Sequence, residues 1–201
     1  PEELERKITK KTKAIIPVHM LGVSTEVDKI TSIAKKNKIV VIDDNCESLG
    51  AKWGKKKLGS QADVCTWSFD TGKTITTGEG GMALTSNEEL AEMIRSLREF
   101  GRAFGGRWDF KDEHMAGYDR RYVFLRPGYN LRMLDLQAAL GRVQLQRLPE
   151  MNARRRAIAS IYSSEIVGEV QLVTGHVYYG YGILHENRDV IVRELDFKGI
   201  E

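Results

Sequence analysis

The chain has 201 residues, which is long enough to bury one sizeable hydrophobic core and a small second unit. With 41% hydrophobic and 29% charged residues, the composition excludes a disordered or collagen-like chain. The formal net charge is only +3, and basic residues are interleaved with acidic ones along most of the chain. Nucleic acid is therefore not an expected partner.

Two cysteines, Cys46 and Cys65, are too few for a disulfide scaffold, and we expect both to be reduced. No apolar stretch approaches the length of a membrane span, and the first residues lack the pattern of a signal peptide. These features predict a soluble cytoplasmic protein. The chain lacks an initiating Met and stops abruptly after G-I-E, so we expect it to be a fragment.

The first third of the chain predicts a helix followed by a strand–helix–strand unit. Pro1 suits the first turn of a helix over residues 1–8. We then expect a short apolar strand at 14–18, a helix with Ser24 as its N-cap, and an apolar strand at 39–42. This order predicts a right-handed βαβ unit with parallel strands, in a sheet covered on both faces.

The next two expected strands, at 64–69 and 82–84, flank a loop rich in Thr and Gly with Lys73 at its middle. A long glycine-rich connection between strands is more often functional than idle. Ligands of such sheets collect beyond the carboxyl ends of the strands. The loop and Asp44, which ends the preceding apolar strand, both fall there, so we expect a ligand site at this edge.

The remaining chain predicts helices, a long irregular arm and a strand-rich end. That end, after a long helix, indicates the start of a second, smaller domain. The expected elements are an exposed turn at 54–57, a helix that starts at Asn87, an irregular arm over 100–130, helices at 133–148 and 151–164 separated by Pro149, strands at 170–173 and 177–184, and a helix at 188–197.

Three other kinds of chemistry fit the sequence less well. The G-K-T at 72–74 resembles the end of a Walker A loop, but Trp67 stands where that loop needs a glycine. The four histidines are scattered without ligand spacing, so no metal site is expected. Ser68 lacks the glycine-flanked elbow of a serine hydrolase.

Lys73 and Asp44 each have an ordinary interpretation beside a functional one. A lone lysine is usually solvated surface, and Asp44 could cap a helix at 47–51. A lysine between buried strands can instead be partly desolvated, as a Schiff-base lysine requires, and a buried carboxylate could pair with a cationic ring nitrogen. Ser68 and the T-T-G run at 76–78 offer hydroxyls and amides for a phosphate.

The combined pattern is more specific than any single motif. The chain reads D-D-N-C-E-S-L-G-A at 43–51, S-F-D-T-G-K at 68–73 and T-T-G-E-G-G at 76–81, with P-V-H-M-L-G at 17–22 before them and G-Y-N-L-R-M at 128–133 after them. On these motifs it resembles the DegT/DnrJ/EryC1/StrS family of enzymes, which use pyridoxal 5'-phosphate (PLP) and act on nucleotide-linked keto sugars. The similarity runs along nearly the whole chain.

The resemblance implies roles for five residues. Lys73 matches the lysine to which the cofactor is attached, and Asp44 matches the carboxylate that keeps the pyridinium nitrogen protonated. Glu47 occupies the position against the cofactor ring, and Ser68 matches the serine that binds the cofactor phosphate. Asn130 matches an asparagine that reaches the phosphate from a neighbouring subunit, which implies a homodimer with a shared active site.

The resemblance also implies the fold class: α/β, a three-layer α/β/α PLP-transferase of fold type I, similar to aspartate aminotransferase, with a mostly parallel sheet. Residues 1–150 would be the C-terminal part of the large PLP-binding domain. Residues 151–201 would be a linking helix and the start of the small C-terminal domain. The family's N-terminal segment, with its own phosphate cup, and most of the small domain are missing from the chain.

The implied activity is transamination of a nucleotide-linked keto sugar, with glutamate as amino donor, in amino-sugar, surface-polysaccharide or antibiotic-sugar biosynthesis. Glu47 and the stretches at 118–122 and 128–130 resemble the family's sugar 3-dehydratase branch, which carries histidine where Lys73 stands. The lysine favours transamination. A keto-sugar 3-dehydratase and a catalytically inactive, regulatory relative remain the alternatives.

Two arginine-rich stretches have different interpretations. The irregular arm over 102–126 is the candidate to contact the sugar-nucleotide diphosphate or the partner subunit, because arginine binds diphosphate through paired donors. The three arginines at 154–156 lack interleaved aromatic residues, so we interpret them as a solvated helix face and not as a nucleic-acid site.

Overall fold

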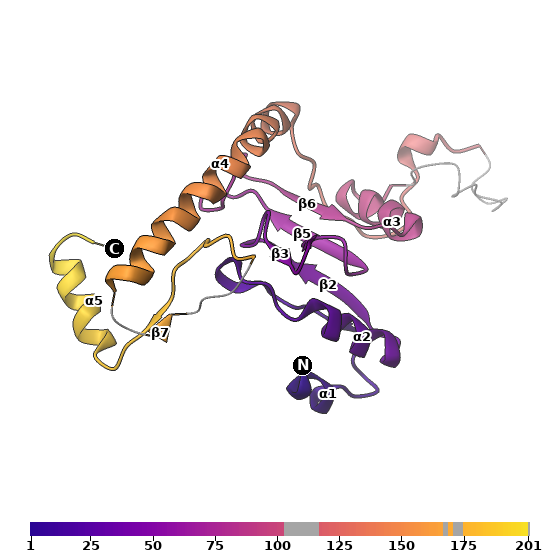
Figure 1. The fold of residues 1–201 in the computed structure, drawn as a ribbon. Coiled ribbons are helices and arrows are strands. Elements are labelled where there is room, and N and C mark those ends of the chain that lie inside the picture. The colour runs from indigo at the N-terminus through magenta and orange to yellow at the C-terminus, as the bar shows by residue number, and fades with distance from the viewer. Residues whose placement is uncertain (103–116, 167–168, 171–174, 201) are drawn as a thin grey trace.

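The computed structural model describes residues 1–102, 117–166, 169–170 and 175–200 (Figure 1). Residues 103–116 of the expected irregular arm and 171–173 of the expected strand at 170–173 therefore lie outside the described residues.

A four-stranded sheet carries the predicted site residues. Its order is β1 (Ala14–Ile15), β2 (Val40–Asp44), β5 (Val64–Ser68) and β6 (Gly81–Leu84). β1, β2 and β5 are parallel, and β6 runs antiparallel to β5. The expectation of a mostly parallel sheet is confirmed for these strands, and the loops after β2 and β5 leave the sheet at the same edge (Figure 1).

Helix α2 (Val27–Asn37) connects β1 to β2, which confirms the expected strand–helix–strand unit. The prediction of Ser24 as its N-cap is wrong. The residue that precedes the helix is Glu26, and the Ser24 hydroxyl donates to the carbonyl of Thr25. The helix ends at Lys38, whose φ of 56° lies in the left-handed region.

Two hydrophobic clusters hold the chain together. The first joins the β1–β2 end of the sheet to α2 and to the short helix α1 (Glu2–Lys7), and its buried members are Ile15, Ala34, Ile39 and Val41. The second packs the lysine loop onto α4 (Asp135–Glu165) through buried Phe69, Ile75 and Leu148. The loop with Lys73 therefore rests on a core of its own.

Two further expected elements are present. The antiparallel pair β3 (Lys52–Trp53) and β4 (Lys56–Lys57) encloses the expected exposed turn. Helix α3 (Glu88–Arg98) begins after Asn87, whose side chain accepts hydrogen bonds from two backbone amides of the first turn.

Helix α4 is one continuous helix of 31 residues, with Pro149 inside it. The prediction of two helices separated by this proline is wrong. A proline removes one backbone donor but does not forbid a helix when packing on both sides holds it, and here Leu148 and Asn152 are both buried against the rest of the chain. The boundary expected at residue 150 falls within this helix.

The first half of α4 exposes apolar side chains, which include Leu136, Leu140, Val143 and Leu145. Leu136, Leu140 and Val143 recur at helical spacing and share one face of the helix. Within the described residues that face is uncovered, and Leu136 is 80% exposed.

The C-terminal part holds a small antiparallel pair, β7 (Glu169–Val170) and β8 (Ile183–Leu184), and helix α5 (Arg188–Phe197), whose expected bounds are confirmed. The prediction of a strand over 177–184 is wrong except at its end. Residues 177–182 form an irregular segment because they bond to the loop that holds η1 (Met20–Gly22) and not to a neighbouring strand.

Candidate active site

The lysine loop is closed by its own backbone. The amide of Phe69 donates to the carbonyl of Gly80 at 2.8 Å, and the amide of Thr77 donates back to the carbonyl of Phe69 at 2.9 Å. Within the loop, Asp70 organises a tight turn: its carbonyl accepts from the Lys73 amide, and its carboxylate accepts from the Gly72 amide. The backbone amides of the turn lower the pKa of Asp70. This turn sets the half-buried Lys73 at the edge of the sheet.

Asp44 occupies the neighbouring strand end. Its amide donates to the carbonyl of Pro17, and its Oδ1 accepts the amide of Cys46 at 3.0 Å. The residues that follow form turns, so the interpretation of Asp44 as the cap of a helix at 47–51 is wrong. Its half-buried carboxylate is held at the carboxyl edge of the sheet, where the resemblance had placed it.

The pKa of the Cys46 thiol is affected by three of the predicted residues. Burial is the largest cause that raises the pKa of its thiol to about 11, and the Asp44 carboxylate raises it further. The Lys73 ammonium and the backbone of Ser68 act in the opposite direction. Cys46 follows Asp44 at the end of β2, and Ser68 ends the adjacent parallel strand β5, so the thiol lies at the same edge of the sheet as these residues.

Glu47 has a partner that the sequence did not indicate. Its Oε2 accepts the backbone amide of Leu21 at 2.6 Å, and Leu21 is held in the left-handed region with a φ of 57°. The carboxylate therefore stabilises a strained loop residue. Its expected position against a cofactor ring stays a prediction.

Asn130 contacts the end of α3. It is exposed, its side-chain oxygen accepts from Arg132 at 3.0 Å, and it bridges to Glu99 at the end of α3. Within the described residues its contacts are with this region. A role toward a second subunit stays a prediction.

A buried pair beneath the site was missed by the sequence reasoning. His19 and Asp43 are both fully buried, and His19 Nε2 lies 2.9 Å from Asp43 Oδ1. Because the Thr25 amide donates to Nδ1 of His19, the ring proton sits on Nε2 and the imidazole donates to the carboxylate. Asn45 donates to the other oxygen of Asp43. The D-D pair that ends β2 thus sends Asp43 into the core, and Asp44 lies half-buried at the site.

Two expected phosphate donors are already used within the loop. The Thr76 hydroxyl donates to the carbonyl of Phe69, and the Thr77 hydroxyl donates to the carbonyl of Glu79. These two hydroxyl protons are engaged within the loop in this structure, and the expectation that the T-T-G run offers hydroxyls and amides to a phosphate stays a prediction. Ser68 differs, because its oxygen accepts from the Asp70 amide at 3.3 Å and its own proton is available to a ligand.

Trp67 has a structural role that accounts for its place in the motif. An added Cβ on Gly59 would lie 2.3 Å from the Trp67 ring, and Gly59 has a φ of +106°. The ring therefore packs directly on the glycine turn. It fills the space that a Walker A loop would need, which agrees with the rejection of that motif.

The arginines of the two arginine-rich stretches have different partners in the structure. Arg102 pairs with Glu99, Arg121 pairs with Asp119, and residues 103–116 of the arm lie outside the described residues. Arg154 and Arg156 are exposed as expected. The interpretation of Arg155 as solvated surface is wrong, because its guanidinium donates to two backbone carbonyls.

The residues present fit a PLP molecule by the chemistry of their donors. Lys73 supplies a primary amine for the aldehyde carbon, and Asp44 supplies a carboxylate for the ring nitrogen. Ser68 supplies a free hydroxyl proton for the phosphate. Asp44 and Ser68 end the adjacent parallel strands β2 and β5, and Lys73 follows in the loop after β5, so the three groups come from one edge of the sheet.

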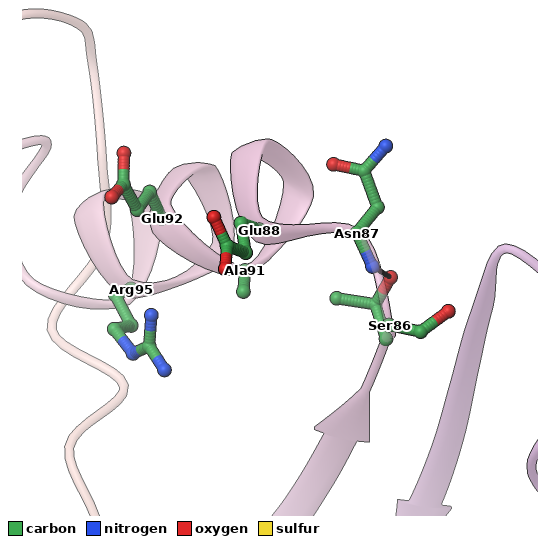
Figure 2. A pocket seen from close by; sticks show the side chains of 7 residues that line it. Ser86, Asn87, Glu88, Ala91, Glu92 and Arg95 are labelled. Carbon is green, nitrogen blue, oxygen red and sulfur yellow. Dashed lines mark hydrogen bonds between the residues drawn. The ribbon is translucent and has the colours of Figure 1, made fainter. Parts of the chain in front are cut away.

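A separate hollow of about 480 Å³ opens at the start of α3 (Figure 2). Its lining includes Asn87, Glu88, Glu92 and Arg95, and none of the predicted site residues. The Asn87 side chain is occupied by the amides of Glu89 and Leu90. This hollow has no connection to the lysine loop.

In the part of the chain that the structure describes, no group of three or more His, Cys, Asp or Glu side chains is arranged to hold a metal ion. Both cysteines are free, as expected. None of the described helices is long and apolar enough to cross a membrane.

Comparison with known proteins identifies the family. Residues 1–200 match the DegT/DnrJ/EryC1/StrS aminotransferase family, and the chain belongs to it. Members of this family are PLP-dependent. The resemblance carried by the motifs is thereby confirmed.

The chain is similar to three proteins whose activities are known by name. The chain is 36% identical to GDP-perosamine synthase of Caulobacter vibrioides, over 99% of the chain and 53% of that protein. E. coli GDP-4-keto-6-deoxy-D-mannose-3-dehydratase, solved with bound hydrated PLP, matches 100% of the chain and 55% of its own, with a TM-score of 0.81 and 29% identity. Helicobacter pylori PseC, an aminotransferase of pseudoaminic acid biosynthesis, matches 98% and 53%, with a TM-score of 0.83 and 27% identity. The chain thus spans about half the length of the relatives it matches.

Proposed function

We propose that the protein transfers an amino group to a nucleotide-linked keto sugar, with PLP as cofactor and glutamate as amino donor. The single observation that carries this proposal is that Asp44 and Ser68 end the adjacent parallel strands β2 and β5, with Lys73 in the loop that follows β5, so that all three come from the carboxyl edge of the sheet. Perosamine synthase and PseC, to which the chain is similar, support an amino-sugar product.

PLP, when bound, would supply an electron sink for the carbanion that forms at the amino donor. Lys73 would hold the cofactor through its amine and, once free, would move a proton at Nζ. Asp44 would hold a proton on the ring nitrogen, and the Ser68 hydroxyl would donate to the phosphate. The buried pair of Asp43 and His19 would keep the end of β2 rigid beneath these groups.

Three finer features belong to the same proposal. We infer a fold of type I with three layers, in which residues 1–150 belong to the large domain and 151–201 to a linking helix and the start of the small domain. We also infer a homodimer in which Asn130 serves the site of the partner subunit. The exposure of Asn130 and of the apolar first half of α4 supports this assembly. The arm over 102–126 is proposed to contact the diphosphate or the partner.

The test is a turnover assay of the full-length protein with a nucleotide-linked keto sugar and glutamate, in which 2-oxoglutarate is measured. Lys73→Ala should lower the rate by at least about 10²–10⁴-fold, the range typical for a group that transfers a proton in the transition state. Lys55→Ala, which removes an exposed lysine from the β3–β4 turn, should leave the rate unchanged. Full turnover by Lys73→Ala would show that the proposal is wrong.

A sugar 3-dehydratase is the second candidate, favoured by Glu47 and by the structural match to the E. coli dehydratase. It predicts loss of a sugar hydroxyl without amination of the product. Lys73→His is expected to divert turnover toward this reaction. A cofactor-free regulatory relative, the third alternative, predicts no PLP absorbance and no borohydride-stable adduct at Lys73.

A further inference from the structure

A strained turn brings a tyrosine from the C-terminal part to the lysine loop. Tyr178 has a φ of +51°, in the left-handed region that residues other than glycine seldom adopt. Its ring stacks on His176 at a centroid distance of 3.9 Å. The next residue, Tyr179, contacts the lysine loop instead. The strained backbone at Tyr178 thus directs two neighbouring tyrosine side chains to different partners.

The turn is held by bonds from two other parts of the chain. Arg155 of α4 donates through Nη1 to the carbonyls of Tyr178 and Tyr179, at 3.3 Å each. The amide of Gly180 donates to the carbonyl of Leu21 at 3.3 Å. These contacts hold the backbone on both sides of Tyr179, so the direction of its side chain is defined by the fold and not by a free loop.

Tyr179 makes two contacts with the lysine loop. Its hydroxyl donates to the carbonyl of Gly72 at 3.1 Å, directly before the lysine. Its ring centroid lies 5.1 Å from Nζ of Lys73, within the range of a cation–π interaction. One contact fixes the backbone of the loop, and the other holds the amine itself.

We propose that Tyr179 is a positioning residue for Lys73, which holds the free lysine amine at the site whenever that amine is not attached to the cofactor. The need to position the free amine rests on the proposed function, because a transaminase must release its lysine from the cofactor and use it again. A lysine side chain loses considerable rotamer freedom when it is ordered. An aromatic face next to Nζ reduces the number of positions that the free amine samples.

The test measures the reactivity of Lys73 in the cofactor-free, full-length protein. Trace acetylation with acetic anhydride, read by mass spectrometry, gives the ratio of Lys73 to Lys56, an exposed lysine of β4 that serves as internal reference. Tyr179→Leu should raise this ratio by about two- to fivefold, the range expected for loss of an exposed cation–π contact. An unchanged ratio would overturn the proposal.

The conservative variant separates the two contacts. Tyr179→Phe keeps the ring and should leave the acetylation ratio close to that of the wild type. It loses the bond to Gly72, so hydrogen exchange at the amides of 72–74 should accelerate. This second measurement decides the matter even where Tyr179→Leu does not fold. Unchanged exchange at 72–74 in Tyr179→Phe would also contradict the proposal.

The matched control is Tyr162→Leu. Tyr162 belongs to an aromatic cluster with His176, Tyr178 and Tyr181 that adjoins Tyr179 in the chain, and its ring lies 5.3 Å from that of Tyr181. The ring over the lysine is that of Tyr179. Loss of the Tyr162 ring should leave the ratio unchanged, and an increase equal to that of Tyr179→Leu would show mere loosening of the cluster. Acetylation of Lys73 needs neither cofactor nor substrate. The acetylation ratio can therefore be measured, and can support or contradict the role of Tyr179, even if the protein turns out not to be a transaminase.

Discussion

At the scale of single residues, the burial and the contacts of each carboxylate decide which of them can serve the proposed site. Asp43 and Asp44 are adjacent in sequence, yet Asp43 is fully buried against His19 and Asp44 is half-buried near Lys73. The alternation of side chains along a strand separates them. Burial and the Asp44 carboxylate raise the pKa of the Cys46 thiol, and the Lys73 ammonium lowers it.

The Cys46 thiol should react slowly with alkylating reagents. Burial, and then the Asp44 carboxylate, raise its pKa from 9.0 to about 11, so the reactive thiolate should be about a hundredfold scarcer at pH 8 than in the unfolded chain. Iodoacetamide labelling of cofactor-free protein, native against urea-unfolded, measures this ratio. Asp44→Asn should accelerate labelling of Cys46 and leave buried Cys65 unchanged. Equal rates in native and unfolded protein would contradict the assigned surroundings.

At the scale of elements, local signals decide where most helices and strands begin. Asn87 stands directly before α3, and its Oδ1 accepts the amides of Glu89 and Leu90 at 2.9 and 3.1 Å. Two of the unpaired amides at the start of the helix are thereby satisfied. Ser24 has the same capping chemistry, yet the chain after it turns once more before α2 begins. The identity of the residue alone does not place a cap.

Replacement of the α3 cap should cost a measurable amount of stability. Asn87→Ala is expected to lower the free energy of unfolding by about 1 kcal/mol, because two helix amides lose their side-chain acceptor. Asn87→Asp keeps an acceptor at the same place and should restore stability. Urea unfolding of both variants compares the two, and equal midpoints for Asn87→Ala and the wild type would refute this role of the cap.

At the scale of the whole molecule, the C-terminal segment is docked on the N-terminal loop. Val177 and His176 are buried, and the amide of Val177 donates to the carbonyl of Gly22. An added Cβ on Gly22 would lie 2.8 Å from the Val177 side chain, and Gly22 has a φ of +90°. This glycine therefore permits the close approach that also brings Tyr179 to the lysine loop.

This docked segment should make stability depend on pH. Burial lowers the pKa of His176 below its ordinary value of 6.5, so the unfolded chain takes up a proton at a higher pH than the folded one. The contribution to stability is complete above about pH 6.5 and is lost as the pH falls through and below that value. His176→Gln should flatten the fall in the urea midpoint between about pH 7.5 and 5.5. His185→Gln, at an exposed histidine, should retain the slope, and an unchanged slope in His176→Gln would contradict the assignment.

Much of the fold and of the candidate site could be predicted from local sequence. Unbroken apolar runs predicted the parallel strands, and apolar residues at helical spacing after Asn87 predicted α3. The glycine-rich motif around Lys73 and the D-D-N-C-E motif after β2 predicted both the family and the region of the site. These signals are local because strands, turns and caps depend on residues that are near in sequence.

What only the tertiary structure decided are contacts between distant residues. Pro149 continues a helix because Leu148 and Asn152 pack against the rest of the chain, and residues 177–182 leave the strand pattern because they bond to the loop at 20–22. The sequence predicted Arg155 to be a solvated surface residue, but in the fold its guanidinium donates to two backbone carbonyls from the C-terminal part. The sequence by itself determined the family, and it predicted the lysine and the edge of the sheet as the site. The structure decided which groups face that lysine, because long-range packing and hydrogen bonding override local propensity.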